Sequence, residues 1–280
     1  MCDPSCASTA SPPAAQPPRN DGLPGDAKAG DDNEARPWYA ESFGHEYLDR
    51  YPRRDRAEAA AAVGMLASRL PLEERVVLDL ACGAGRHIAP LLAQGARRVV
   101  GLDLSEALLA VARHDLEPEL GAGRVELVPG DMREIPLAQD SVDVVTNFFT
   151  SFGYFDSEAQ DRRVLAEVAR VLRPGGHFML DFFNAPKVIA ELVAEETLVV
   201  DGKPHRVERW FDESRRRLEK RVYDAASRVQ LRESVRAYEP DELHALTRDV
   251  GLSRVEQLGG YDGSVYDPAT SPRIIAIFRK

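Results

Sequence analysis

The sequence has few cysteines and no long apolar run, which argues against a disulfide-rich protein and against a membrane-spanning one. Its 280 residues include only three cysteines, too few for a disulfide framework. No apolar stretch reaches the roughly 18–20 residues of a membrane span, and the N-terminus has no apolar signal-peptide core. Basic residues are outnumbered, since the formal net charge is −10, which argues against a nucleic-acid or anionic-membrane surface. We therefore expect a cytoplasmic protein that binds neither nucleic acid nor a membrane.

The first 36 residues have almost no bulky apolar side chains. They are rich in Pro, Ala, Ser, Gly and Asp, so burial cannot offset the entropy of ordering them. We predict a disordered tail over residues 1–36 and one folded domain over 37–280. Cys2 and Cys6 lie in this tail without further Cys or His partners, so no metal site is predicted.

The stretch 76–87, VVLDLACGAGRH, organises the rest of the chain. An apolar run typical of a buried parallel strand leads to Asp79, a small-residue turn over 81–85 and the start of a helix. Strand, glycine turn and helix form the first half of a nucleotide-binding βαβ unit. Ile88 occupies the third glycine position of a dinucleotide fingerprint, and the Gly-Lys-Ser/Thr of a P-loop is absent. The turn therefore favours a different nucleotide ligand.

Alternating strands and helices continue on both sides of a central interruption. We predict strands at 76–80, 98–102, 125–128, 142–147, 177–183, 253–258 and 274–278. We predict helices at 56–69, 86–94, 106–114, 158–172 and 240–251. A turn over 173–176, RPGG, separates a helix from a strand because proline blocks the helix and glycine caps it. Residues about 195–238 show partial alternation instead, which predicts three or four antiparallel strands.

These motifs together resemble the class I S-adenosylmethionine (SAM)-dependent methyltransferases of the bacterial small-molecule type, from about Trp38 to the end. The family's motif I, acidic-x-Gly-x-Gly-x-Gly, falls on Asp79, Ala81, Gly83 and Gly85, with Ala81 replacing the first glycine. The segments FTSFGYF at 149–155 and LRPGG at 172–176 are also similar. The resemblance implies an α/β fold, a Rossmann-like seven-stranded sheet whose last strand is antiparallel. We expect the segment 195–238 to form a small antiparallel β cap over the pocket.

The resemblance also implies how the cofactor S-adenosyl-L-methionine is held. Asp103, about 20 residues past the glycine turn, stands where a ribose diol is bound. Asp131 and Met132 match adenine-contacting positions, and the alternative for Asp131 is a loop-capping aspartate. Asp79 and Gly83 would border the methionine moiety. The predicted cofactor-binding residues are Asp79, Ala81, Gly83, Gly85, Asp103, Leu104, Asp131, Met132 and Asn147.

The segment after the fourth strand corresponds to the place where methyl donor and acceptor meet in the family. Tyr154 is the first candidate for contact near the transferred methyl, and a packed aromatic is the equal alternative. The further candidate substrate contacts are Tyr39, Phe149, Ser151 and Arg209. No general base is evident. His87, His177 and His205 are weaker candidates, and a structural role is favoured for each of them.

Two other groups of side chains leave alternatives open. Phe43, Tyr47 and Tyr51 have helical spacing, and such a helix either packs on the core or covers the pocket. Five arginines of the cap segment belong to a solvated strand face or to an anion-recognising surface. They are Arg206, Arg209, Arg215, Arg216 and Arg217.

The predicted function is methyl transfer from SAM to a small-molecule acceptor by in-line displacement, at nitrogen or oxygen rather than carbon or sulfur. Two alternatives are kept. One is an NAD(P)-dependent oxidoreductase on a similar fold, and the other is a SAM-binding module without catalysis. The only expected partner is the small-molecule acceptor, and the protein is expected to be a monomer or homodimer.

Overall fold

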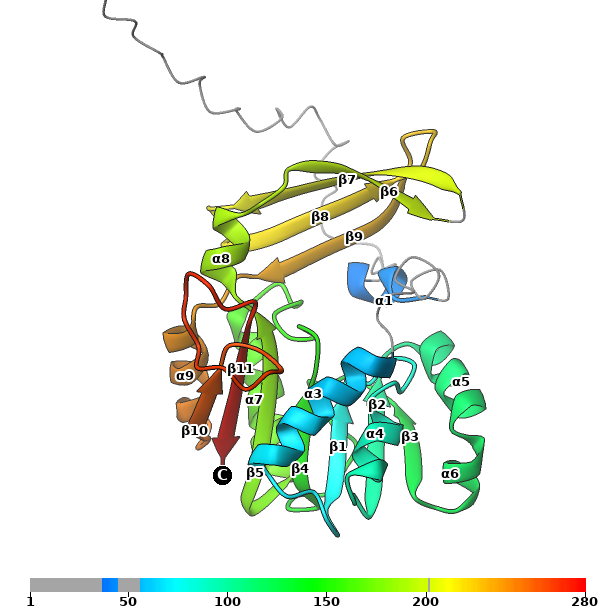
Figure 1. Cartoon of the computed structure of the whole chain (residues 1–280), viewed down its shortest axis with the longest axis vertical. Helices are drawn as coiled ribbons and strands as arrows, with labels where there is room; N and C mark the ends of the chain where they lie inside the picture. Colours follow the sequence, from blue (N-terminus) through cyan, green and yellow to red (C-terminus); the bar gives the residue numbers. More distant parts are fainter. Residues whose placement is uncertain (1–36, 45–55, 201) are drawn as a thin grey trace, which may run out of the picture. The chain divides into compact units, whose positions relative to one another are not determined.

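A seven-stranded sheet forms the centre of the fold. The computed structural model describes residues 37–44, 56–200 and 202–280. The strand order is β3-β2-β1-β4-β5-β11-β10 (Figure 1). The strands are β1 (Val76–Leu80), β2 (Arg98–Asp103), β3 (Val125–Pro129), β4 (Val142–Asn147), β5 (Leu172–Phe183), β10 (Ser253–Leu258) and β11 (Arg273–Arg279). Strands β1 to β5 pair in parallel, and β11 is antiparallel to both of its neighbours, which confirms the predicted sheet.

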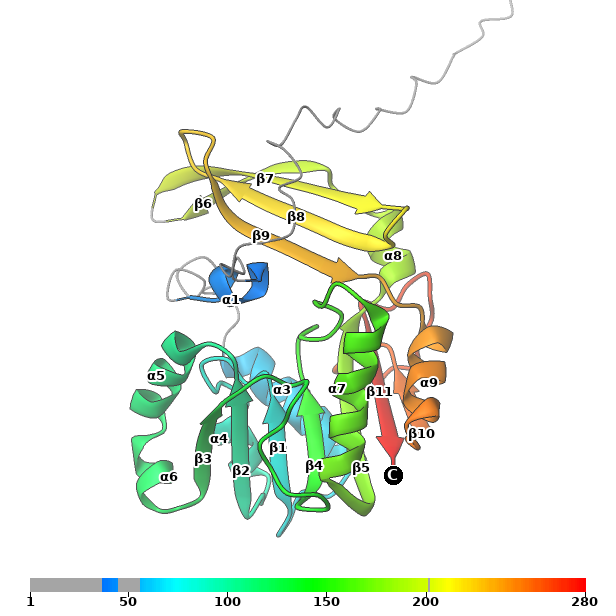
Figure 2. The same cartoon turned by 180° about the vertical axis from the view of Figure 1, so that it is seen from behind.

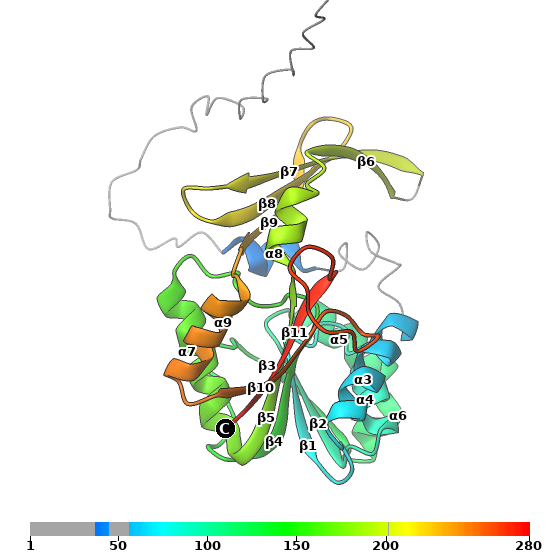
Figure 3. The same ribbon diagram turned by 60° about the vertical axis from the view of Figure 1, so that its left-hand side comes forward.

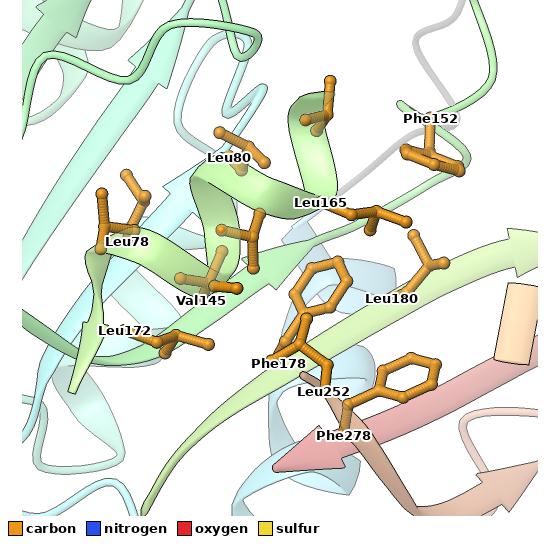
Figure 4. Close-up of a cluster of buried hydrophobic side chains, with 14 of the residues drawn as sticks. Leu78, Leu80, Val145, Phe152, Leu165, Leu172, Phe178, Leu180, Leu252 and Phe278 are labelled. Carbon is orange, nitrogen blue, oxygen red and sulfur yellow. The ribbon is translucent and has the colours of Figure 1, made fainter. Parts of the chain in front are cut away.

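Helices cover both faces of this sheet (Figure 3). One face carries α3 (Arg56–Arg69), α4 (Ile88–Ala93) and α5 (Glu106–Asp115), and the other carries α7 (Glu158–Val171) and α9 (Pro240–Asp249). Because both faces are buried, β1 is apolar except for Asp79, and every one of its residues is buried. Figure 4 shows the core on the α7 face, where Leu165 packs with Leu78 and Phe178. Two short helices, α6 (Glu117–Gly121) and α8 (Ala185–Ala190), were not predicted from the sequence.

The segment 195–236 forms a separate four-stranded antiparallel sheet (Figure 2). Its strands are β6 (Glu195–Val200), β7 (Lys203–Asp212), β8 (Arg217–Tyr223) and β9 (Val229–Arg236). Val207, Val222 and Leu231 make a small apolar cluster on one face of this sheet. The backbone N–H of Arg236 donates to the Gly153 carbonyl at 2.8 Å, so the sheet joins the loop that follows β4. The predicted antiparallel segment is confirmed.

The five arginines lie on β7, on β8 and in the turn between these strands. Four are partly or fully exposed and pair with carboxylates of the chain itself, so they agree with the solvated face and do not form an open anion-binding surface. These ion pairs are Arg206–Glu208, Arg209–Glu196, Arg215–Glu219 and Arg216–Glu242. The fifth, Arg217, is 1% exposed and donates to backbone carbonyls. Two of the partners are close in sequence, since Glu208 lies on the same strand as Arg206 and Glu219 is four residues after Arg215. The other two, Glu196 and Glu242, lie on β6 and α9, so alternation along one strand does not reveal them.

Two local predictions need correction. β5 begins at Leu172 rather than His177, since Leu172 already pairs with Val142 of β4 and the RPGG residues form an irregularity within the strand. Lys280 holds this irregularity from the neighbouring strand, accepting from Gly175 and donating to Gly176 through its backbone. The helix α1 (Trp38–Ser42) ends before Phe43, so Phe43 does not continue the predicted helical stripe. The other stripe residues, Tyr47 and Tyr51, lie outside the described residues.

Candidate functional site

The turn after β1 lies where the sheet order reverses. β1 pairs with β2 on one side and with β4 on the other, and ligands of open α/β sheets bind at the carboxyl ends of such strands. Ala81, Gly83 and Gly85 have φ of 59°, 56° and 75°, the left-handed region that favours glycine. Ala81 keeps the turn, as expected from its small size. A Cβ at Gly85 would come within 3.0 Å of Leu116, so this glycine is needed for packing.

An open cavity lies over this turn. Its wall comes from α1, the β1 turn, the ends of β2 and β3, and the loop after β4. The residues that line it include Tyr39, Phe43, Ala81, Gly83, Arg86, His87, Asp103, Leu104, Asp131, Met132, Phe149, Ser151, Tyr154 and Phe155.

Asp103 links the turn to the end of β2. One carboxylate oxygen accepts from the Gly83 N–H at 2.7 Å and the other accepts from the Ser105 N–H at 2.8 Å. Burial raises the pKa of Asp103, and these backbone N–H groups oppose the rise. Each carboxylate oxygen has a further lone pair, so the group can accept from two vicinal hydroxyls while it fixes the turn. This geometry fits a ribose.

Asp131 caps its own loop and also faces the cavity. Its Oδ1 accepts from the Arg133 backbone N–H at 2.8 Å, and Arg133 Nη2 lies 2.5 Å from Oδ2. Burial raises the pKa of Asp131, but the hydrogen bonds from Arg133 outweigh this and hold it below its ordinary value. The loop-capping alternative is therefore real in this structure, while the neighbouring Met132 offers an apolar surface to the cavity.

Two predicted residues lie behind the cavity wall with unsatisfied atoms. Asp79 and Asn147 are each 1% exposed. Thr146 Oγ1 donates to Asp79 Oδ1 at 3.1 Å, and Asn147 Nδ2 donates to the Leu80 carbonyl at 2.9 Å. Asp79 Oδ2 and Asn147 Oδ1 have no hydrogen-bond partner. Burial raises the pKa of Asp79 to about 7. Two buried orphan acceptors next to the turn fit a ligand that carries an ammonium group.

The cysteine of the turn is a packing residue. Cys82 is buried, and its Sγ lies 2.9 Å from where a Cβ would stand on Gly101 of β2. Burial raises the pKa of its thiol well above the ordinary value, with the charges of Asp79 and Asp103 adding to the rise. A neutral buried thiol is a poor nucleophile.

Aromatic rings form another part of the cavity wall. Tyr154 stacks on Phe43 with ring centroids 5.6 Å apart and meets Trp38 edge-on at 5.3 Å. Tyr39 meets Phe155 edge-on at 5.4 Å. α1 contacts β9, and Ser105 Oγ donates to the Phe43 carbonyl at 2.7 Å. Tyr39 and Phe43 therefore both pack against other rings and line the cavity. The two alternatives for the stripe that includes Tyr47 and Tyr51 stay a prediction, because those residues lie outside the described part of the chain.

The loop after β4 is held in an unusual conformation. Phe149 and Thr150 both have φ of 61°, which costs roughly 1–2 kcal/mol per non-glycine residue. Fully buried Asp181 supports them. Its Oδ2 accepts from the Phe149 N–H at 2.9 Å and from the Tyr261 hydroxyl at 2.6 Å, and its Oδ1 pairs with Arg273. Strain supported in this way is typical of functional sites.

The structure brings most of the predicted residues to one cavity. The cavity wall includes Tyr39, Ala81, Gly83, Asp103, Leu104, Asp131, Met132, Phe149, Ser151 and Tyr154. Arg209 is placed elsewhere, on β7, where it pairs with Glu196. Sequence reasoning missed Arg86 and Phe155, and it placed His87 among the structural residues. Arg86 and His87 directly follow the glycine turn, and this position could have indicated them as cavity residues.

Comparison with known proteins agrees with this geometry. Residues 77–176, from β1 into β5, match the family model described as a methyltransferase domain. The chain carries a methyltransferase domain. This confirms the predicted methyltransferase domain over these residues, with S-adenosylmethionine as the cofactor of the domain. The oxidoreductase alternative is not favoured.

Curated relatives of this domain differ in their acceptors. A demethylmenaquinone methyltransferase of Clavibacter sepedonicus is 41% identical over 118 residues, 42% of this chain and 45% of that protein. A dTDP-4-amino-2,3,4,6-tetradeoxy-D-glucose N,N-dimethyltransferase of Saccharopolyspora spinosa is 37% identical over 123 residues, 43% of this chain and 45% of the relative. The chain thus spans about half the length of the curated relatives it matches. The shared part does not decide the acceptor.

The fold extends further than the sequence match. The SAM-bound amino pentose methyltransferase CalS10 of Micromonospora echinaspora has a TM-score of 0.60 at 24% identity, over 84% of this chain and 97% of that one. Among the residues that the structure describes, no helix is long and apolar enough to span a membrane. The same part of the chain has no cluster of three or more potential metal ligands.

Proposed function

We propose that the protein transfers a methyl group from S-adenosylmethionine to the nitrogen of a small-molecule amine. The observation that carries the proposal is one continuous cavity. It joins the turn and Asp103, which suit the nucleoside, to the aromatic wall of Tyr39, Tyr154 and Phe155, which suits a second molecule. The name of the Saccharopolyspora spinosa relative, an amino-sugar N,N-dimethyltransferase, supports an amine acceptor.

The side chains of the aromatic wall favour nitrogen over oxygen. An aliphatic hydroxyl needs a base to become a good nucleophile, whereas an uncharged amine does not. Among the described residues, the aromatic wall offers hydroxyls such as Ser151 and Tyr154 but no carboxylate. His87 is a weak base, since burial and the charge of Arg86 lower its pKa well below the ordinary value.

In the proposed mechanism the protein binds the two reactants, aligns them and excludes water. SAM, when bound, supplies a methyl group already activated on a sulfonium sulfur. Asp103 would hold the ribose, and the orphan acceptors of Asp79 and Asn147 would hold the ammonium. The strained loop at Phe149 and the α1 aromatics would position the acceptor and exclude water, and such positioning can account for a large part of a displacement barrier.

A labelled-methyl screen tests the function. The full chain is incubated with methyl-labelled SAM and matched pairs of acceptors that differ only in an amino or a hydroxyl group, including amino-sugar nucleotides. Label is expected on the amines. Label only on hydroxyl or carbon acceptors would refute nitrogen as the acceptor atom. SAM binding without transfer to any acceptor of the panel would favour the non-catalytic alternative.

SAM binding is expected to weaken as the pH falls below about 7. In the ligand-free protein Asp79 has a pKa of about 7, so its carboxyl is protonated at lower pH. An ammonium partner favours the ionised form, so binding must release this proton, and the Kd should rise by up to about tenfold per pH unit. Calorimetry between pH 5.5 and 7.5 measures the trend. An Asp79→Asn variant with the same pH dependence would refute the assignment.

Replacing Tyr154 by Phe is expected to affect the acceptor and not the cofactor. The substitution keeps the ring stacked on Phe43 and removes only the hydroxyl. We expect KM for the amine to rise about tenfold, the loss of one hydrogen bond, with an unchanged Kd for SAM. Full activity with unchanged KM would show that Tyr154 is only a packed aromatic.

A further inference from the structure

Asp181 accepts hydrogen bonds from two consecutive residues of the loop after β4. Its Oδ2 accepts from the Phe149 N–H, and its backbone carbonyl accepts from the Thr150 N–H, each at 2.9 Å. Asp181 lies near the end of β5, the strand that pairs with β4. Both loop residues have φ of 61°, a region that residues other than glycine rarely adopt. The two hydrogen bonds therefore hold the backbone in a conformation that these side chains disfavour.

The carboxylate of Asp181 is in turn fixed from two other parts of the chain. It is 0% exposed, and a buried carboxylate needs polar partners. The Tyr261 hydroxyl donates to Oδ2 at 2.6 Å, and Arg273 at the start of β11 pairs with Oδ1. Burial and the charge of Asp181 raise the pKa of Tyr261, so its hydroxyl stays protonated and remains a donor. These partners fix the direction in which the carboxylate meets the loop.

The same network contacts the Phe149 ring. The guanidinium of Arg273 lies 4.7 Å from the centroid of this ring and donates to Thr150 Oγ1 at 3.4 Å. Phe149 lines the cavity, as does Tyr154 of the same loop. Of the described residues in the network, only Phe149 lines the cavity. Asp181 can therefore influence a ligand only through the loop that it holds.

We propose that Asp181 is a positioning residue for the methyl acceptor. By holding residues 149 and 150 in the left-handed region, it places the Phe149 ring against the acceptor. This inference rests on the proposed function, which supplies the acceptor. If the loop kept this conformation in only about a tenth of the molecules, the apparent KM for the acceptor would rise about tenfold. Saturating acceptor would restore the conformation by binding to it, so kcat would change much less.

Asp181→Asn tests the role of the carboxylate with a side chain of the same shape. An amide has one acceptor oxygen, and the charge of Arg273 attracts it, which leaves the NH2 group opposite the Phe149 N–H. With the amine that the wild type methylates fastest in the labelled-methyl screen, we expect KM to rise about tenfold or more and kcat to stay within about threefold. The Kd of S-adenosylhomocysteine, measured by calorimetry, should stay within about twofold.

Glycine at position 150 provides a matched rescue. Glycine adopts positive φ without support, so Asp181→Asn combined with Thr150→Gly should return KM to within about threefold of the wild type. Combined with Thr150→Ala, the variant also loses the threonine side chain but keeps the steric preference against positive φ, so its KM should stay raised. Thr150→Gly alone should leave KM and kcat unchanged.

The outcomes separate positioning from a general loss of structure. Loss of folded enzyme would lower kcat without raising KM, and that result would overturn the inference. An unchanged KM in folded Asp181→Asn, or equal rescue by alanine and glycine, would also overturn it. If thermal unfolding shows that Asp181→Asn is not folded, Tyr261→Phe removes one donor to the same carboxylate. Its KM should rise about threefold, the loss of one hydrogen bond, and an unchanged KM would overturn the inference.

The proposed function fails in a different way. A wild-type chain that binds S-adenosylhomocysteine but methylates no amine of the panel would overturn the proposed function, and this inference with it. A wild-type chain that methylates an amine, with the same KM in folded Asp181→Asn, would overturn the positioning role alone.

Discussion

Replacing Asp103 by Ala is expected to weaken SAM binding by at least about 100-fold. The carboxylate accepts from Gly83 and Ser105 and has lone pairs left for two hydroxyls of a ribose. Hydrogen bonds to a charged group contribute roughly 1.5–3 kcal/mol each, so losing both ribose contacts alone gives this factor. The turn at Gly83 also loses its support. Calorimetric titration of the full chain with S-adenosylhomocysteine measures the effect without turnover.

Asp131→Ala is the matched control for this experiment. Asp131 also lines the cavity, but its carboxylate is already engaged by Arg133 and its own loop. We therefore expect a smaller loss of affinity, about tenfold or less. Thermal unfolding of both variants checks that they are folded. An Asp103→Ala variant that is folded and binds within about threefold of the wild type would refute the ribose assignment.

Replacing Arg217 by Met is expected to destabilise the protein by about 3–5 kcal/mol. Its guanidinium donates to the carbonyls of Gly153, Tyr154 and Phe155 and to both oxygens of Ser234. Methionine preserves much of the volume but removes five hydrogen bonds to buried oxygens, and breaking a buried charged network has this magnitude. The free energy of unfolding is measured by urea denaturation followed by circular dichroism.

Arg228→Met separates this effect from a general loss of positive charge. Arg228 also belongs to the four-stranded sheet segment, but its side chain is 77% exposed and pairs with Asp224. Its replacement should change the free energy of unfolding by less than about 1 kcal/mol. If Arg217→Met were equally mild, the buried network would not be what joins this sheet to the loop that carries Tyr154.

The main sheet could be predicted because its signals are local. The segments 76–80 and 142–147 gave the bounds of β1 and β4, since both are rich in Val, and the first also in Leu, as is typical of strands buried on both faces. Ser105 indicated the start of α5, and its side chain does accept from the Leu108 N–H at 3.2 Å. The start of β5 was wrong because Lys280, 104 positions beyond Gly176, holds the RPGG segment in the sheet.

For this protein the sequence alone determined the glycine turn, the acidic end of β2 and the family, because these features depend on residue type and short spacing. Only the tertiary structure decided what each long side chain does. Arg217 could not be distinguished from Arg209 by alternation, yet one is buried against a loop 64 residues away and the other pairs with Glu196 on the next strand. The same holds for His87, whose unsatisfied nitrogen exists only because Phe148 and the turn enclose it. A hydrogen-bonding group is defined by its surroundings, and those come from chain segments that the sequence separates widely.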